Sequence, residues 1–210
     1  MRTNSNVRRE FLTLASALIL LALAVPASAG TLYTNGPIKG SDDAATINFG
    51  FSVSDSFTLL TTSALGGVDF GVWLLPGDTV SSVDWAIGTS AFDNSMGHGK
   101  GIVSGTFQFT NAYGYNIYSD SFDLPGLDLA AGSYYLTLQN ASAGGDPVYW
   151  DENEGPSAAY QSSGGPGIKI DSESFDIRSA VVATPEPGTM ILLGSFFGLG
   201  GLLRRRQRCR

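Results

Sequence analysis

Apolar residues recur at every second position along much of the chain, and this alternation limits the fold more than any other feature. It is clearest in Val68–Leu74 and Val83–Ile87, and it returns in Val103–Phe109 and Tyr134–Leu138. A period of two places alternate side chains on opposite faces of a β-strand. These segments therefore predict half-buried strands.

A further strand is predicted over Thr46–Val53, where Ile47, Phe49, Phe51 and Val53 alternate with smaller residues, and Ser56–Leu60 continues the extended stretch. Gly, Pro, Asn and Asp punctuate the strands, and no helical period of useful length lies between Gly30 and Thr184. The sequence thus predicts an all-β domain over residues 30–183, an antiparallel β-sandwich of jelly-roll or immunoglobulin-like type. Shorter candidate strands are Tyr115–Tyr118, Val148–Trp150, Ile168–Ile170 and Phe175–Val181.

Three tryptophans occupy different places in this pattern. Trp85 alternates with Val83 and Ile87, which predicts a core position. Trp73 lies between Val72 and Leu74, on the opposite face, where it is either exposed or covers a second layer. Tryptophan and tyrosine rings stack on sugars when exposed. We therefore take three residues as candidates for carbohydrate binding: Tyr149, Trp150 and Trp73.

No constellation of catalytic residues is evident. The sole histidine, His98, lies in the glycine-rich segment 94–101, for which we expect a loop that would hold a catalytic base poorly. The sole cysteine, Cys209, lies beyond the predicted domain. A pair of carboxylates around Asp151–Glu154 leaves a glycoside hydrolase open. We nevertheless predict that the protein is not an enzyme.

The acidic segment after Trp150 offers oxygen ligands that suit a hard cation such as calcium. Its candidate ligands are Asp151, Asn153 and Glu154, although the segment lacks the complete pattern of an EF-hand loop. An acidic turn without a ligand is the alternative. Apart from this candidate calcium site, the sequence predicts no cofactor.

Charge is distributed unevenly along the chain. Residues 30–183 contain 17 acidic and four basic side chains, a net charge of −13, whereas most arginines lie at the two ends. Such an acidic body repels phosphate backbones, which argues against nucleic acid as a partner.

The N-terminus has the three parts of a secretory signal peptide. Arg8 and Arg9 precede an apolar run from Phe11 to Val25, and the small residues Ala27 and Ala29 fit the site of a signal peptidase. We predict a signal peptide over residues 1–29, cleaved after Ala29, with a retained membrane helix as the alternative. The paired arginines also resemble a twin-arginine signal, which would export the domain already folded.

The C-terminus combines Pro185-Glu186-Pro187-Gly188, an apolar run from Met190 to Leu203 and a cluster of five arginines. This arrangement resembles the PEP-CTERM sorting signal of bacteria that make extracellular polysaccharide. The resemblance covers residues 184–210, with a membrane helix over 189–203. It implies that an exosortase-type membrane enzyme recognises Pro185, Glu186 and Pro187 and removes the tail. The arginines would stay cytoplasmic, which places the acidic domain outside.

These features predict a non-enzymatic, exported cell-surface or extracellular matrix protein. It would be anchored transiently in the inner membrane through its C-terminal helix, processed at the PEP segment and associated with extracellular polysaccharide. The alternative is a carbohydrate-binding module, with calcium assisting the binding.

Overall fold

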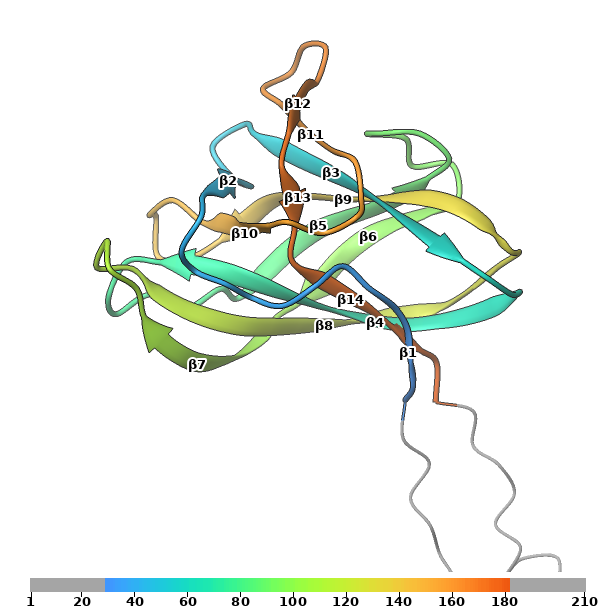
Figure 1. Cartoon of the computed structure of the whole chain (residues 1–210), viewed down its shortest axis with the longest axis horizontal. Helices are drawn as coiled ribbons and strands as arrows, with labels where there is room; N and C mark the ends of the chain where they lie inside the picture. The colour runs from blue at the N-terminus through green and yellow to red at the C-terminus, as the bar shows by residue number, and fades with distance from the viewer. Residues whose placement is uncertain (1–28, 182–210) are drawn as a thin grey trace, which may run out of the picture. The chain divides into compact units, whose positions relative to one another are not determined.

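The computed structural model describes residues 29–181, and within them it is an all-β, sandwich-like fold of two antiparallel sheets without a helix (Figure 1). This confirms the predicted class. The predicted signal peptide and the C-terminal helix lie outside the described residues. Among residues 29–181, no helix has the length and apolar character needed to cross a membrane.

The larger sheet has eight strands. Its path runs β1-β14-β4-β10-β13, while β2 pairs with β10, and β8 pairs with both β4 and β7. The bounds are β1 Thr31–Thr34, β2 Ala44–Thr46, β4 Ser63–Leu74, β7 Ser104–Thr110, β8 Asn116–Leu129, β10 Tyr149–Asn153, β13 Ser172–Glu173 and β14 Phe175–Ser179.

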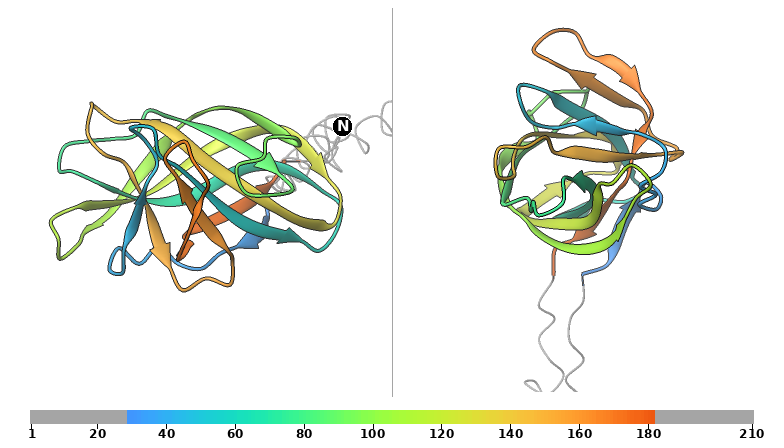
Figure 2. Two further views of the ribbon diagram at one scale, coloured as in Figure 1. Left: turned by 90° about the horizontal axis from the view of Figure 1, so that it is seen from above. Right: turned by 90° about the vertical axis from the view of Figure 1, so that its left-hand side faces the viewer.

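The smaller sheet has six strands in the order β12-β11-β3-β9-β5-β6, and it lies over the larger one in the side view of Figure 2. Its strands are β3 Ser52–Leu59, β5 Ser82–Gly88, β6 Gly97–Ile102, β9 Gly132–Ser142, β11 Ala159–Ser162 and β12 Ile168–Ile170.

One continuous core fills the space between the sheets, and it contains the alternating residues of the longest strands. Val68, Phe70, Val72 and Leu74 of β4 are all buried, as predicted. Trp85 is also buried, so its predicted core position is confirmed. Burial of large side chains of this kind contributes roughly 1.5–3 kcal/mol each.

The strand predicted over Thr46–Val53 is wrong in its middle. Ile47 and Val53 are buried, but Phe49 and Phe51 are exposed, because a turn separates β2 from β3. Phe49 has a φ of 53° and Gly50 a φ of 84°, and Phe51 N donates to the Asn48 carbonyl (3.0 Å). The alternating pattern therefore continues across a chain reversal.

The loop expected around His98 is instead strand β6, which pairs with β5. Its glycines allow the strand to pack closely against neighbouring aromatic rings. A side chain at Gly101 would collide with Phe122, and one at Gly99 would press on the ring of Trp85. The absence of side chains on this face lets β6 cover two aromatic rings.

Strand β7 is formed as predicted, but it is exposed along its whole length, including Phe107 and Phe109. It lies at an edge of the larger sheet, where it pairs only with β8. Strand β8 is much longer than the predicted Tyr115–Tyr118. It pairs with β4 over nearly its whole length, including positions occupied by polar residues.

Candidate functional site

Strand β4 organises the outer face of the larger sheet, the face away from the core. It pairs with β8 on one side, and on the other side with β14 and then with β10. Since Val68, Phe70 and Val72 point inward, Asp69, Gly71 and Trp73 point outward. Along the outer face of this strand, a carboxylate, a glycine without a side chain and an aromatic ring follow one another.

Packing at the junction of β14 and β10 requires that residue 71 has no side chain. A Cβ at this position would collide with Ser174 Oγ and the side chain of Ile38. Gly71 N donates to the Ser174 carbonyl (3.2 Å), which also accepts from Trp150 Nε1 (2.9 Å). The segment 36–40 therefore crosses β4 between Asp69 and Trp73.

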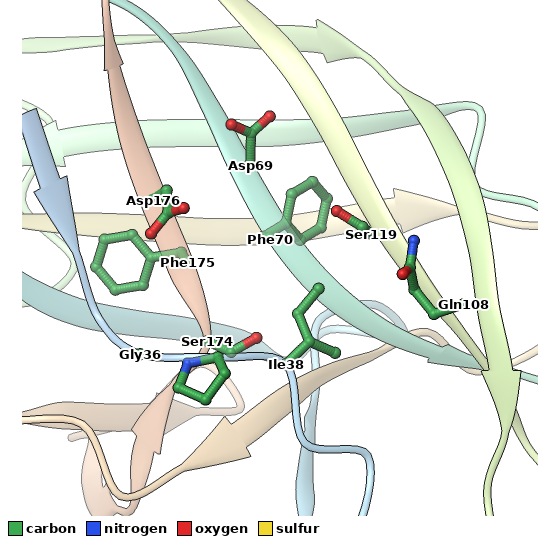
Figure 3. A pocket seen from close by; sticks show the side chains of 10 residues that line it. Gly36, Ile38, Asp69, Phe70, Gln108, Ser119, Ser174, Phe175 and Asp176 are labelled. Carbon is green, nitrogen blue, oxygen red and sulfur yellow. The ribbon is translucent and has the colours of Figure 1, made fainter. Parts of the chain in front are cut away.

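Beside this crossing lies a cavity of about 290 Å³, which we call the outer groove (Figure 3). Its size is near the lower end of known ligand pockets, roughly 300–1,000 Å³. The polar side chains come from β4, β7, β8 and β14 and from Ser174 between β13 and β14, and segment 36–38 closes one side. The residues that line it are Gly36, Pro37, Ile38, Asp69, Phe70, Gln108, Ser119, Ser174, Phe175 and Asp176.

Two aspartates lie side by side in the outer groove. Asp69 of β4 and Asp176 of β14 are direct cross-strand partners, an arrangement that repels when both are charged. Arg178 Nε forms an ion pair with Asp69 (3.1 Å), and Arg178 Nη2 forms another with Asp123 (3.3 Å). Burial raises the pKa of Asp69, Arg178 opposes this rise, and Asp176 adds to it.

Polar atoms of the outer groove remain without partners. Within residues 29–181, neither Asp176 Oδ1 nor Ser174 Oγ has a hydrogen-bond partner, although both atoms are buried. The Ser174 residue is only 1% exposed. Buried polar atoms usually have partners. The Ser174 hydroxyl also lowers the pKa of Asp151, so Asp176 Oδ1 is the atom of the two that no other group of the described chain engages.

Asp151 holds segment 36–40 in place. Its carboxylate accepts from Lys39 N (2.8 Å), from Gly40 N (2.8 Å) and from the indole N–H of Trp73. Burial raises the pKa of Asp151, and these hydrogen bonds act against the rise. Asp151 is a candidate calcium ligand by its sequence, and in the structure its carboxylate holds the wall of the outer groove.

The other two candidate calcium ligands are also engaged elsewhere. Asn153 Nδ2 donates to the carbonyls of Asn35 (2.8 Å) and Pro37 (3.3 Å), whereas the exposed Glu154 pairs with Lys39 (3.3 Å). Over residues 29–181, no group of three or more His, Cys, Asp or Glu side chains is arranged to hold a metal ion.

Four aromatic residues gather where β4 ends, and we call them the aromatic cluster: Trp73, Tyr113, Tyr115 and Tyr149. Tyr113 stacks on Trp73 with ring centroids 5.8 Å apart and planes 19° apart, and Tyr115 contacts both Trp73 and Tyr149. Trp73 is only 6% exposed because Tyr113, itself 64% exposed, covers it.

The three candidate carbohydrate-binding residues therefore do not lie in one place. Trp73 and Tyr149 belong to the aromatic cluster, but Trp150 is fully buried in the core, where its ring contacts Phe70 and Phe175. Trp150 offers no ring face to a ligand, because β10 turns it inward between the sheets.

A second group of acids lies inside the domain, and we call Asp55, Glu152 and Glu173 the buried carboxyl cluster. Glu152 and Glu173 face each other on β10 and β13, and Asp55 accepts from Glu173 N (2.8 Å). Asn35 and Ser157 also donate to Asp55 (3.0 and 2.8 Å). Among the described residues, neither carboxylate oxygen of Glu173 has a hydrogen-bond partner.

Burial changes the acidity of this cluster strongly. It raises the pKa of Asp55 to about 6 and that of Glu152 to about 7, and neighbouring carboxylates add to the rise at Glu152. The pKa of Glu173 lies well above its ordinary value for the same two reasons. Asp120, which points inward from β8, has its pKa raised by burial to about 7.

Several predicted site residues lie outside the described part of the chain. They are Ala27 of the signal-peptidase site and the sorting residues Pro185, Glu186 and Pro187. Ala29 is the first described residue.

The outer groove was not predicted from the sequence, although part of its pattern is visible there. Asp69 stands between Val68 and Phe70, and Asp176 between Phe175 and Ile177, so alternation places both carboxylates on outer faces. Nothing in the local pattern shows that β4 and β14 pair in the register that brings the two together.

Comparison with known proteins adds no identification. No protein family matches the chain, and no curated protein sequence matches it.

Proposed function

We propose that this protein is a non-enzymatic, exported cell-surface or extracellular matrix protein that associates with extracellular polysaccharide. A signal peptide over residues 1–29 exports it. A sorting tail over 184–210, with a membrane helix at 189–203, anchors it transiently in the inner membrane until an exosortase-type enzyme cuts near Pro187. The domain between them would be a sandwich of jelly-roll or immunoglobulin-like type.

The observation that carries this proposal is that the two ends of the domain lie together. Strands β1 and β14 are antiparallel neighbours (Figure 1). Gly30 N donates to Ser179 Oγ (2.8 Å), and Ser179 N donates to the Gly30 carbonyl (2.7 Å). The described domain thus begins and ends at neighbouring points, so removal of the residues before Gly30 and of the predicted tail would leave its paired strands intact.

The opposite end is then free to meet a matrix. Strand β4 pairs with the end of β14 through Leu65, and it reaches the aromatic cluster at Trp73. Eight residues of strand separate these positions, a length of about 26 Å. The aromatic cluster is therefore remote from the paired termini.

The arrangement of acids supports a binding role over hydrolysis. Glycoside hydrolases place two carboxyl groups on either side of the scissile bond. Asp69 and Asp176 lie on neighbouring strands of one face, and Asp69 is paired with Arg178. Incubation with polysaccharide should release no new reducing ends, and a steady release would refute the non-enzymatic assignment.

Replacing Glu186 by Ala tests the sorting proposal. The intact mass of the exported protein should correspond to termini at Gly30 and near Pro187, and the Glu186→Ala variant should retain residues 190–210. Glu154→Ala, a change at an exposed acid within the domain, serves as the matched control and should be processed normally. Unchanged processing of Glu186→Ala would remove exosortase from the proposal.

The second candidate function is a carbohydrate-binding module, with calcium assisting, and the stacked pair Tyr113–Trp73 favours it. An exposed ring backed by a second ring offers a rigid platform for a sugar. Tyr113→Ala should weaken binding to polysaccharide, whereas Leu60→Ala, at another exposed apolar residue, should not. An affinity for polysaccharide that changes neither in Tyr113→Ala nor on addition of calcium would count against this candidate.

A further inference from the structure

The outer groove has a charge imbalance that a ligand can correct. Asp69 and Asp176 lie side by side, and the guanidinium of Arg178 pairs with Asp69 and with Asp123. Within residues 29–181, no ion pair involves Asp176. One carboxylate of the groove is therefore balanced by a cation, and the other has none.

The polar atoms available to a ligand surround this unbalanced carboxylate. Asp176 Oδ1 and Ser174 Oγ are buried without hydrogen-bond partners in the described chain. Ser119 of β8 and Gln108 of β7 line the same cavity (Figure 3). The register of β7 shifts beside Gln108, and such bulges re-aim a side chain. The set offers two hydroxyls, an amide and a carboxylate.

The size and walls of the cavity select a small, compact group. Its volume of about 290 Å³ suits one ring with its substituents better than a long chain. Segment 36–38 closes one side, and Asp151 holds this segment through the amides of Lys39 and Gly40. The wall is thus preorganised, which lowers the entropy lost on binding.

Charge also decides which ligands are excluded. The domain has a net charge of −13, and the groove itself carries two carboxylates, so uronic acids and phosphorylated sugars are repelled. A protonated amine gains a charge-assisted hydrogen bond with Asp176, which is stronger than one from a hydroxyl.

We propose that the outer groove binds an amino-sugar unit of a glycan, with its protonated amine on Asp176 and its hydroxyls on Ser174, Ser119 and Gln108. This inference rests on the proposed association with polysaccharide, and it specifies the class of sugar. Neutral sugars bind the same groove more weakly, and uronates do not bind it.

Calorimetric titration of the exported protein with three oligosaccharides tests the assignment. At mildly acid pH, where the amine is protonated, a glucosamine oligomer should bind more tightly than an N-acetylglucosamine oligomer of equal length. A uronate oligomer should show no binding. Asp176→Asn should weaken the glucosamine complex about tenfold, the effect of one charge-assisted hydrogen bond.

Two further variants separate this role from a loss of folding or of general charge. Asp128→Asn makes the same charge change at an exposed residue of β8 outside the groove, and it should leave affinity unchanged. Gln108→Ala changes the exposed edge strand β7, so it should keep the thermal midpoint of unfolding and still lower affinity.

The outcomes distinguish this inference from the function on which it rests. If Asp176→Asn and Gln108→Ala both bind as the wild type does, the groove assignment is wrong while association with glycans stands. If calcium displaces the glycan through Asp176, the groove is a cation site and the assignment is also wrong. If the protein binds none of the oligomers and no polysaccharide, the proposed association itself fails.

Discussion

The outer groove and the buried carboxyl cluster both bring acids together, but they differ in what surrounds the carboxyl groups. In the groove, Asp69 has Arg178 as a partner and solvent is near. In the cluster, Glu173 is fully buried and faces Glu152, and after burial the largest effects on its pKa come from neighbouring carboxylates. An acid without a cation or solvent keeps its proton, whereas an acid with either can remain charged.

Charge therefore affects ligand binding in the groove and stability in the cluster. The groove can exchange solvent for a ligand, because its polar atoms line an open cavity. The cluster adjusts by taking up protons, since burial opposes the charged form of every member. Three changes test the difference, from the largest expected effect to the smallest.

Raising the pH from about 5 to about 8 should destabilise the domain. The folded chain retains protons on Asp55, Asp120, Glu152 and Glu173 that the unfolded chain, with ordinary pKa values near 4, releases. For Asp55, Asp120 and Glu152 this contribution is complete below about pH 4 and is lost as the pH rises through about 6 to 7, whereas that of Glu173 is lost only as the pH rises through its own strongly raised pKa. A tenfold difference in proton affinity corresponds to about 1.4 kcal/mol, so together the groups contribute on the order of several kcal/mol.

Thermal unfolding at a series of pH values measures this effect. Asp120→Asn removes one titrating group and should flatten the dependence, whereas Asp128→Asn, at an exposed position, should leave it unchanged. A midpoint that rises between pH 5 and pH 8 would show that these four acids do not control stability in this range.

Asp151→Ala should have the next largest effect, a loss of about 3 kcal/mol in the free energy of unfolding. The change leaves the amides of Lys39 and Gly40 and the indole N–H of Trp73 without their acceptor, and unsatisfied buried donors are costly. Urea denaturation measures the loss. Asp151→Asn keeps one acceptor oxygen and should lose less, so equal losses would contradict the role in hydrogen bonding.

Arg178→Gln should change stability least, by about 0.5 kcal/mol, because its ion pairs are partly solvated. It removes the cation of the groove, so the pKa of Asp69 should rise further. An NMR titration of the Asp69 carboxyl follows this rise. Lys100→Gln, which breaks the exposed ion pair with Asp84, is the control and should leave Asp69 unaffected.

Prediction from sequence succeeded where a strand has one face in the core. The alternation in β4 and β5 reports burial directly, because every second side chain of these strands meets the opposite sheet. It failed at Phe49 and Phe51, where alternation continued through a turn, and at β6, where glycines that suggested a loop allow close packing on Trp85. Local pattern cannot show which rings a neighbouring strand must cover.

The candidate sites were predicted less well than the strands. Tyr149 and Trp73 do share a cluster, but the fold adds Tyr113 and Tyr115 from a hairpin far away in the sequence and buries Trp150. Asp151 and Asn153, chosen for their oxygen atoms, form hydrogen bonds with backbone groups of segment 35–40, and calcium binding by them stays a prediction. The hydrogen-bond partners of a polar side chain depend on which loop crosses it. The residues next to it in the sequence do not indicate which loop that is.

By itself, the sequence determined that the domain is built of strands, which faces of the central strands are apolar, and where the charges lie along the chain. These properties are local, since they follow from the two-residue period of a strand and from composition. Only the tertiary structure decided that β14 and β10 share one side of β4, so that Asp69 meets Asp176 and Glu152 meets Glu173. The physical reason is that strand register follows from packing the whole core, and long-range pairing brings together residues that no local pattern connects.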